Sequence, residues 1–179
     1  MTVDLVIPDP SLVVLVGAAG AGKTTFATRH FATAEILSSD AYRAKIAGDE
    51  ADQRATRVAF RLLHGDLERR LAGRRLTVVD ATNLERSTRA ALLARAATTG
   101  LPAIAIVIDL PADVVLGRNA GRSARVVDAR VVARHLARLR ETLDRPGPPL
   151  HDEPFERVVV LRDARDVEAI RIVRRPHDG

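Results

Sequence analysis

The sequence contains no cysteine and no tryptophan, and only 3% of its 179 residues are aromatic. Without cysteine, disulfides, thiolate metal sites and cysteine nucleophiles are excluded, and a reducing cytoplasm is permitted. With so few aromatic residues no stacking platform is evident, which weakens the case for tight binding of single-stranded nucleic acid.

Long apolar runs are missing as well. No run approaches the roughly 18 residues that a membrane span requires. The N-terminal segment MTVDLVIPDP is acidic and interrupted by proline, whereas a signal peptide has a basic start followed by an apolar run. We therefore expect a soluble, cytoplasmic protein with no membrane partner.

The composition is that of a globular protein. Hydrophobic residues make up 46% of the chain and charged residues 28%, which predicts a single domain over residues 1–179. The net charge of +5 has two open explanations. One is a polyanionic partner such as nucleic acid, and the other is the coding composition that leaves Lys23 and Lys45 as the only lysines.

Apolar segments of strand length alternate with segments of helical spacing. The expected strands are 12–16, 34–38, 75–80, 103–109 and 157–161, with a further candidate at 169–173. The expected helices are 24–30, 53–71, 87–97, 112–118, one capped by Asp128 that reaches residue 143, and a turn at 164–167. Because parallel strands need crossover connections, this order predicts an α/β fold with a mostly parallel central sheet of about five strands flanked by helices. Residues 12–16 would form its central strand, and the tail 174–179 is expected to be frayed.

The clearest motif follows the first expected strand. Residues 17–24 match the P-loop or Walker A pattern G-x-x-x-x-G-K-[ST] between a strand and a helix, as that motif requires. Small residues let the backbone wrap around phosphate, Lys23 would reach the β- and γ-phosphates, and Thr24 would ligate Mg²⁺. ATP and Mg²⁺ are therefore the expected cofactors. The residues assigned to ATP in this segment are Gly17, Ala18, Ala19, Gly20, Ala21, Gly22, Lys23, Thr24 and Thr25.

Acidic residues follow the second and third expected strands. A kinase needs a group that accepts the proton of the acceptor hydroxyl, and Asp40 is the candidate, with Arg43 one helical turn later to hold an anionic acceptor. The alternative is that Asp40 only caps a helix beginning at residue 41. Asp80 is placed to orient the metal's water shell, or else serves as a turn or cap residue.

Three arginines lie at spacings of four and three in a basic segment. Arg118, Arg122 and Arg125 are suited to the charge that develops during phosphoryl transfer, which predicts an arginine-bearing lid over about 119–127. The alternative is a solvated helix face. The histidines show no ligand pairing and are expected to be structural or on the surface. They are His30, His64, His135, His151 and His177.

The segments GAAGAGKTT, SSDAYR, VVDATN and RNAGRSAR together resemble the kinase domain of bacterial and animal polynucleotide 5′-kinases, within the AAA-type group of P-loop kinases. The resemblance covers about residues 12–143. It implies that Lys23 acts on the phosphates, that Asp40 is the general base and that Arg43 holds the acceptor's 3′-phosphate. It also implies that the lid arginines contact the ATP phosphates, and the stretch 49–53 is similar to an acidic segment of bacterial members that ends in glutamine.

The resemblance implies an ATP-dependent kinase that phosphorylates the 5′-OH end of DNA or RNA. Two alternatives stay open: a P-loop kinase of a small metabolite or nucleotide, and an acceptor-less P-loop ATPase or nucleotide switch. Many family members carry the kinase beside a phosphatase or ligase. A separate phosphatase or ligase is therefore a candidate partner of this chain.

Overall fold

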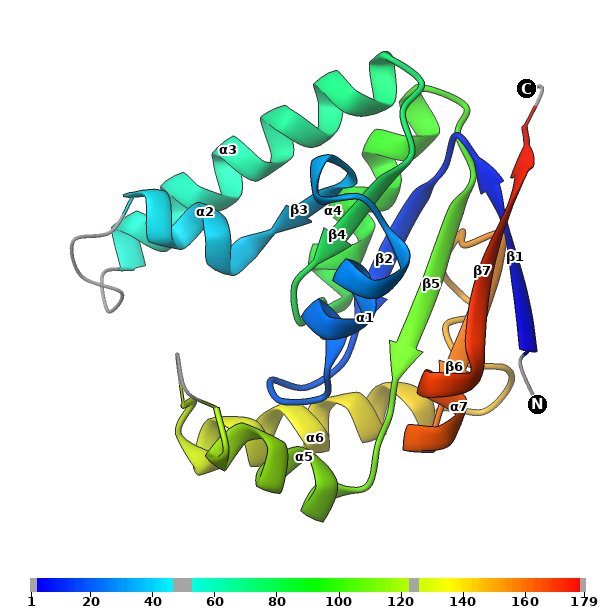
Figure 1. Ribbon diagram of the computed structural model, residues 1–179. Coiled ribbons are helices and arrows are strands. Elements are labelled where there is room, and N and C mark those ends of the chain that lie inside the picture. Colours follow the sequence, from blue (N-terminus) through cyan, green and yellow to red (C-terminus); the bar gives the residue numbers. More distant parts are fainter. Residues whose placement is uncertain (1–2, 47–52, 123–125, 178–179) are drawn as a thin grey trace.

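The central element is a five-stranded parallel sheet, seen in a computed structural model that describes residues 3–46, 53–122 and 126–177 (Figure 1). The strand order is β3-β4-β2-β5-β6, and all four pairings are parallel. The strands are β2 (Leu12–Val16), β3 (Ile36–Ser38), β4 (Thr77–Asp80), β5 (Ala103–Ile108) and β6 (Arg157–Leu161). The predicted α/β fold, the five strands and the central position of residues 12–16 are confirmed.

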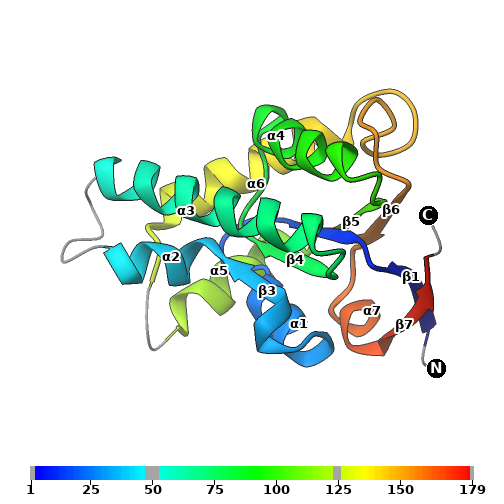
Figure 2. The same ribbon diagram turned by 90° about the horizontal axis from the view of Figure 1, so that it is seen from above.

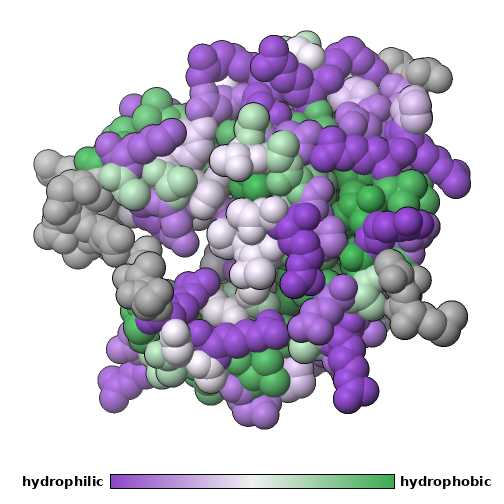
Figure 3. All heavy atoms as spheres, in the orientation of Figure 1, coloured by the Kyte–Doolittle hydropathy of each residue, from purple (hydrophilic) through white to green (hydrophobic). Residues whose placement is uncertain are grey.

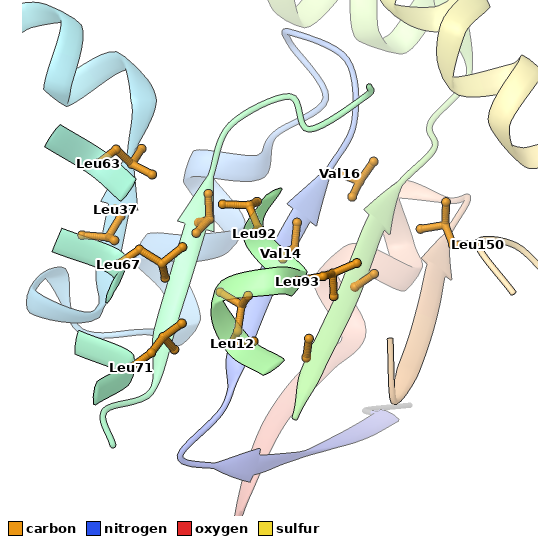
Figure 4. Close-up of a cluster of buried hydrophobic side chains, with 14 of the residues drawn as sticks. Leu12, Val14, Val16, Leu37, Leu63, Leu67, Leu71, Leu92, Leu93 and Leu150 are labelled. Atoms are coloured by element: carbon orange, nitrogen blue, oxygen red, sulfur yellow. The ribbon is translucent and has the colours of Figure 1, made fainter. Parts of the chain in front are cut away.

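The central strand β2 is buried on both faces. Leu12, Val14 and Val16 point into one apolar cluster (Figure 4), and Val13 and Leu15 point into the other. Each of the five side chains is at most 1% exposed. Because successive side chains of a strand alternate between faces, a continuous apolar run suits a strand that helices cover on both sides.

Helices cover the two faces of the sheet as separate layers (Figure 2). The layer on the Leu12 face is formed by α3 (Gln53–Ala72) and α4 (Arg86–Thr98), and α2 (Ser39–Ile46) packs against α3. The opposite layer includes α1 (Lys23–His30) and α5 (Ala112–Ala120). None of the helices within the described ranges combines the length and hydropathy that a membrane crossing needs.

Helix α6 (Ala129–Leu143) contributes to both layers. Its first half buries Val132 in the cluster of α1 and α5, and its second half buries Leu139 in the cluster of α3 and α4. Asp128 caps this helix as predicted, because its Oδ1 accepts from the amide of Arg130 at 2.7 Å. The helix therefore approaches the carboxyl edge of the sheet and reaches the P-loop side of the molecule (Figure 1).

A second, two-stranded sheet joins the two ends of the chain. The strands β1 (Val3–Asp9) and β7 (Ile170–Pro176) pair in parallel. No strand was predicted at β1, and the prediction of a frayed tail is wrong for the first three residues of that tail. They pair with residues 7–9, and Arg174 donates to both carboxylate oxygens of Glu35 at 2.8 Å.

Two of the differences from the predicted element boundaries lie close to the site. The segment expected as a strand at 34–38 begins with a 3₁₀ turn, η1 (Thr33–Glu35), because the amide of Ala32 donates to the Glu35 carboxylate at 2.9 Å. Helix α2 begins at Ser39 instead of residue 41. Asp40 consequently lies inside the first helical turn and not at a cap position before it.

Candidate active site

The P-loop forms a tight turn between β2 and α1. Gly20 and Gly22 have positive φ angles of 88° and 98°, which only glycine adopts without strain. A Cβ on Gly20 would lie 2.8 Å from the carbonyl oxygen of Val115 and 3.0 Å from the Cβ of Asn119. The loop is therefore held against α5 at a distance that excludes a larger residue.

Lys23 is enclosed by this loop. Its Nζ donates to the carbonyl oxygens of Gly17 at 3.0 Å and Ala18 at 2.8 Å, and the residue is 8% exposed. Burial lowers the pKa of Lys23 to about 8; the charge of Asp80 opposes this effect and that of Arg122 adds to it. An anionic phosphate in the loop would stabilise the ammonium form of Lys23.

Thr24 and Asp80 meet at the carboxyl ends of β2 and β4. Thr24 Oγ1 donates to Asp80 Oδ2 at 2.8 Å, and Asp80 is 4% exposed. Burial raises the pKa of Asp80, while the hydrogen bond from Thr24 and the charge of Lys23 oppose that rise. A hydroxyl and a carboxylate are hard oxygen donors of the kind Mg²⁺ prefers.

The described residues hold no cluster of three or more His, Cys, Asp or Glu side chains suited to a metal. A protein site with few oxygen donors suits Mg²⁺ bound together with nucleotide phosphates and water, which is how this ion is commonly held. The donor set therefore fits a magnesium–nucleotide complex better than a metal held by the protein alone.

The loop after β4 is fixed to the P-loop by polar contacts. The amide of Gly17 donates to the carbonyl oxygen of Thr82 at 3.0 Å. Asn83, with a positive φ of 47°, donates from Nδ2 to the carbonyl oxygen of Leu15 at 2.7 Å. These contacts hold Asp80 in place beside Thr24.

A buried ion pair supports the same loop from behind. Arg89 is 1% exposed and donates to the carbonyl oxygens of Asn83 at 2.9 Å and Leu84 at 2.7 Å. Its other guanidinium nitrogens bind the carboxylate of Glu153 at 2.8 and 2.5 Å. The segment before β6 thereby supports the loop that follows β4.

A cavity of about 270 Å³ lies at this edge of the sheet. The structure brings seven predicted residues to its wall, and Figure 3 shows the surface hollowed between the part over α2 and α3 and the part over α5. The seven residues are Ala19, Lys23, Thr24, Asp40, Arg43, Asp80 and Arg122. Lys23, Asp40 and Asp80 follow three different strands, and as predicted they lie together at one edge of the sheet.

Asp40 and Arg43 are in contact on α2. One nitrogen of Arg43, Nη2, donates to Asp40 Oδ1 and lies 3.4 Å from Ser39 Oγ. The Nε of Arg43 is buried and has no hydrogen-bond partner among the described residues. Arg43 lines the cavity, while this nitrogen is enclosed by protein atoms.

A second cavity, of about 310 Å³, lies on the other side of the P-loop. It is lined by Gly22, Thr25 and Arg118, and by Val167 and other residues of α7 (Ala164–Ala169). Arg118 Nη1 donates to the carbonyl oxygen of Ala21 at 3.5 Å. Arg118 does not line the cavity that holds Asp40. Arg122 lines both cavities, whereas Arg125 and residues 49–52 of the acidic stretch lie outside the described residues.

Several residues that line this cavity were missed by sequence reasoning, among them His135 and Phe60. His135 of α6, expected to be structural or on the surface, lines the first cavity, and its Nδ1 accepts from the P-loop amide of Ala19 at 3.4 Å. Burial and the charge of Lys23 lower the pKa of His135. Phe60 of α3 also lines this cavity. Neither residue belongs to a motif, and only the approach of distant helices brings them to the site.

The chain matches one protein family and a number of solved structures. The model of the family described as AAA domain matches residues 12–146, and the chain belongs to that family. No curated protein matches the sequence. The similar solved structures share its fold, that of the P-loop kinases.

One similar chain comes from a structure of the Pnkp1/Rnl/Hen1 RNA repair complex, with 21% identity and a TM-score of 0.67. The match covers 80% of the present chain and 49% of that chain, so the present chain spans about half of its relative. A sugar kinase from Janibacter sp. HTCC2649 is 23% identical over 86% of this chain and 85% of its own, with a TM-score of 0.58. The adenosine phosphosulfate (APS) kinase CysC of Mycobacterium tuberculosis is 17% identical, covers 91% and 95%, and has a TM-score of 0.55.

Proposed function

We propose that the chain is an ATP-dependent kinase that transfers the γ-phosphate to the 5′-OH end of DNA or RNA. The observation that carries the proposal is that Asp40 and Arg43 face the same cavity as Lys23, Thr24 and Asp80. A nucleotide switch without an acceptor needs the last three residues only. A carboxylate paired with an arginine at the far wall gives the cavity a place for an acceptor as well.

The P-loop lies between the two cavities, which supports an extended path for the nucleotide. The triphosphate would follow the loop to Lys23, assisted by Arg122 and, by the resemblance, Arg125. The nucleoside would occupy the second cavity between Arg118 and α7. Mg²⁺ would be held by Thr24 and, through water, by Asp80, and would help neutralise the phosphate charge.

The proposed reaction is an in-line displacement. Asp40 takes the proton of the acceptor hydroxyl, the hydroxyl oxygen forms a bond to the γ-phosphorus, and the bond to the β–γ bridging oxygen breaks to release ADP. Lys23 and Arg122 neutralise the charge on the transferred group. The guanidinium group of Arg43, a residue of the cavity wall, suits an anionic group of the acceptor, such as the 3′-phosphate of its first nucleotide.

A small-molecule acceptor is the second candidate, and the likeness to a sugar kinase and an APS kinase supports it. The sugar kinase and the APS kinase are matched over 85% and 95% of their own lengths, whereas the chain from the RNA repair complex is matched over 49%. That complex nevertheless supports the idea that the present chain acts together with separate repair proteins, such as a phosphatase or ligase. Arg43 favours an acceptor that carries a negative charge, which a neutral sugar lacks.

The acceptor assay tests the proposal. Purified protein receives γ-labelled ATP and Mg²⁺ with 5′-OH DNA and RNA oligonucleotides, nucleosides, nucleoside 3′-monophosphates, gluconate, APS and neutral sugars, each in a separate reaction. Label on the 5′ end of an oligonucleotide is the expected result. Label only on gluconate, APS or a sugar would replace the nucleic-acid acceptor by a metabolite, and release of phosphate without any labelled acceptor would favour an ATPase.

The role of Asp40 has its own test. Asp40→Asn keeps the shape of the side chain but removes the base, so kcat should fall by at least about 100-fold while ATP binding stays within a few-fold. Asp113→Asn, an exposed carboxylate change in the first turn of α5, is the matched control and should leave kcat unchanged. Equal activity of Asp40→Asn and the control would show that another group accepts the proton.

A further inference from the structure

A surface groove along α3 and α4 shares one lining residue, Phe60, with the proposed catalytic cavity. Phe60 lines the catalytic cavity, a small neighbouring cavity of about 160 Å³ beside the loop after β4, and a surface groove of about 540 Å³. These three hollows therefore adjoin at one half-buried aromatic ring. The side chains that line the groove include Arg57, Phe60, Arg61, His64, Glu68 and Arg95.

The groove carries excess positive charge. Arg57 and Arg61 are exposed and form no ion pair with the described residues, whereas Arg95 binds Glu68, the one acidic residue of the groove lining within the described ranges, at 2.9 Å. Two unpaired guanidinium groups on successive turns of a helix suit successive negative charges on a ligand. Arginine also binds phosphate with planar, paired hydrogen bonds.

The middle of α3 leaves the floor of the groove open. Gly65 lies inside the helix, and a Cβ on it would meet no atom within 4 Å. Glycine costs a helix interior about 1 kcal/mol relative to alanine, and no contact of the described chain requires glycine here. The position is therefore open to an occupant that lies against the helix backbone.

We infer that this groove binds the acceptor strand beyond its 5′ nucleotide, with phosphates at Arg57 and Arg61 and a base against Phe60. The inference rests on the proposed function and narrows the acceptor to a single strand of several nucleotides. Alternating phosphates and bases match a groove that combines arginines with one aromatic ring. The edge-on contact between Phe60 and His64, at 6.3 Å between ring centroids, holds the Phe60 ring at the junction.

The groove gives different expectations for long and short acceptors. A mononucleotide or a metabolite occupies the catalytic cavity and does not reach Arg57 or Arg61. A strand of several nucleotides reaches them and gains affinity from each phosphate contact. The KM should therefore fall as the acceptor is lengthened from a nucleoside 3′-monophosphate to about eight nucleotides, within the range of known single-strand sites.

The experiment compares acceptor kinetics of the wild-type protein and of the double variant Arg57→Ala/Arg61→Ala. For the long acceptor we expect KM to rise about 10-fold or more with kcat unchanged. In a plot of log affinity against log salt concentration, the slope should become shallower by about 0.7 for each lost phosphate contact. For the mononucleotide both constants should stay the same. Arg69→Ala, an exposed arginine on the same helix outside the groove, is the control.

A second variant tests the groove without removing any side chain. Gly65→Glu places a carboxylate in the open floor, where it has room, and it should also weaken the long acceptor and spare the short one. Thermal unfolding of each variant verifies that the protein is folded.

The outcomes separate this inference from the proposed function. Phosphorylation of oligonucleotides with no dependence on length, on Arg57 and Arg61 or on Gly65→Glu would overturn the groove and leave the 5′-kinase proposal standing. If no phosphorylation is seen, the fluorescence anisotropy of a labelled strand measures binding to the groove directly. Binding that the groove variants weaken, without any phosphorylation, would retain the groove and overturn the kinase proposal, and no binding and no phosphorylation would overturn both.

Discussion

Replacing Lys23 by methionine is expected to stabilise the folded protein, although it removes the lysine that would bind phosphate. Lys23 is 8% exposed, and burial is the main reason that its pKa falls from 10.5 to about 8. The ammonium form is therefore less favourable in the folded state than in the unfolded chain. Methionine fills similar space and carries no charge.

The size of the effect follows from that difference in pKa. At about 1.4 kcal/mol for each pH unit, the fall from 10.5 to about 8 corresponds to a cost of about 3 kcal/mol at neutral pH. The variant also loses the hydrogen bonds to Gly17 and Ala18, which offsets part of the gain. We expect a net stabilisation of about 1–3 kcal/mol, or a rise in Tm of about 2–4 °C for each kcal/mol.

The pH dependence has the opposite sign to that of a lysine in an ion pair, whose pKa is raised by folding. Between pH 8 and pH 10.5 the unfolded state holds a proton on Lys23 that the folded state has lost, so wild-type stability rises with pH in that window. The cost of the charge is present in full below pH 8. The advantage of Lys23→Met should therefore be largest below pH 8 and shrink as the pH approaches 10.5.

Thermal unfolding at about pH 7 and about pH 9.5, with EDTA and without nucleotide, measures both quantities. Lys45→Met is the matched control, because Lys45 is the only other lysine and is exposed, with its Nζ 5.3 Å from the centre of the Tyr42 ring. It should change stability by less than about 1 kcal/mol at either pH. A Lys23→Met protein that is no more stable than wild type at pH 7 would refute the reasoning.

Two further substitutions test the supports of the site. Arg89→Met leaves Glu153 buried without its partner and should lower the free energy of unfolding, measured in urea, by about 3–5 kcal/mol. Adding Glu153→Leu should recover much of that loss. An equal loss in the single and double variants would contradict this. Gly20→Ala places a Cβ 2.8 Å from the carbonyl oxygen of Val115 and should weaken ATP binding at least about 10-fold, as calorimetry can measure. Gly117→Ala, where a Cβ meets nothing within 4 Å, should leave binding intact and raise stability by up to about 1 kcal/mol.

The parts of the fold that depend on local patterns could be predicted from the sequence. Residues 12–16 form one apolar run, and such a run between a proline and a glycine-rich turn predicts a strand buried on both faces. The P-loop geometry depends on neighbouring residues, so the motif alone placed Lys23 and Thr24. Asp40 and Asp80 could be assigned to one edge because the carboxyl ends of parallel strands meet there.

The parts that depend on distant pairing could not. β1 is stabilised by β7, whose residues lie more than 160 positions later, and no local pattern indicates that partner. His135 reaches the P-loop only because α6 crosses the edge of the sheet. Arg89 is one arginine among many in the sequence, and only its burial against Glu153 distinguishes it.

A competition assay distinguishes a nucleic-acid acceptor from a metabolite acceptor. The protein receives γ-labelled ATP and Mg²⁺ in one reaction with equal concentrations of a 5′-OH oligonucleotide, a nucleoside 3′-monophosphate, gluconate and APS, and the labelled products are separated. Most label should appear on the 5′ end of the oligonucleotide, and Asp40→Asn should abolish it. Label concentrated on gluconate or APS would contradict the nucleic-acid acceptor.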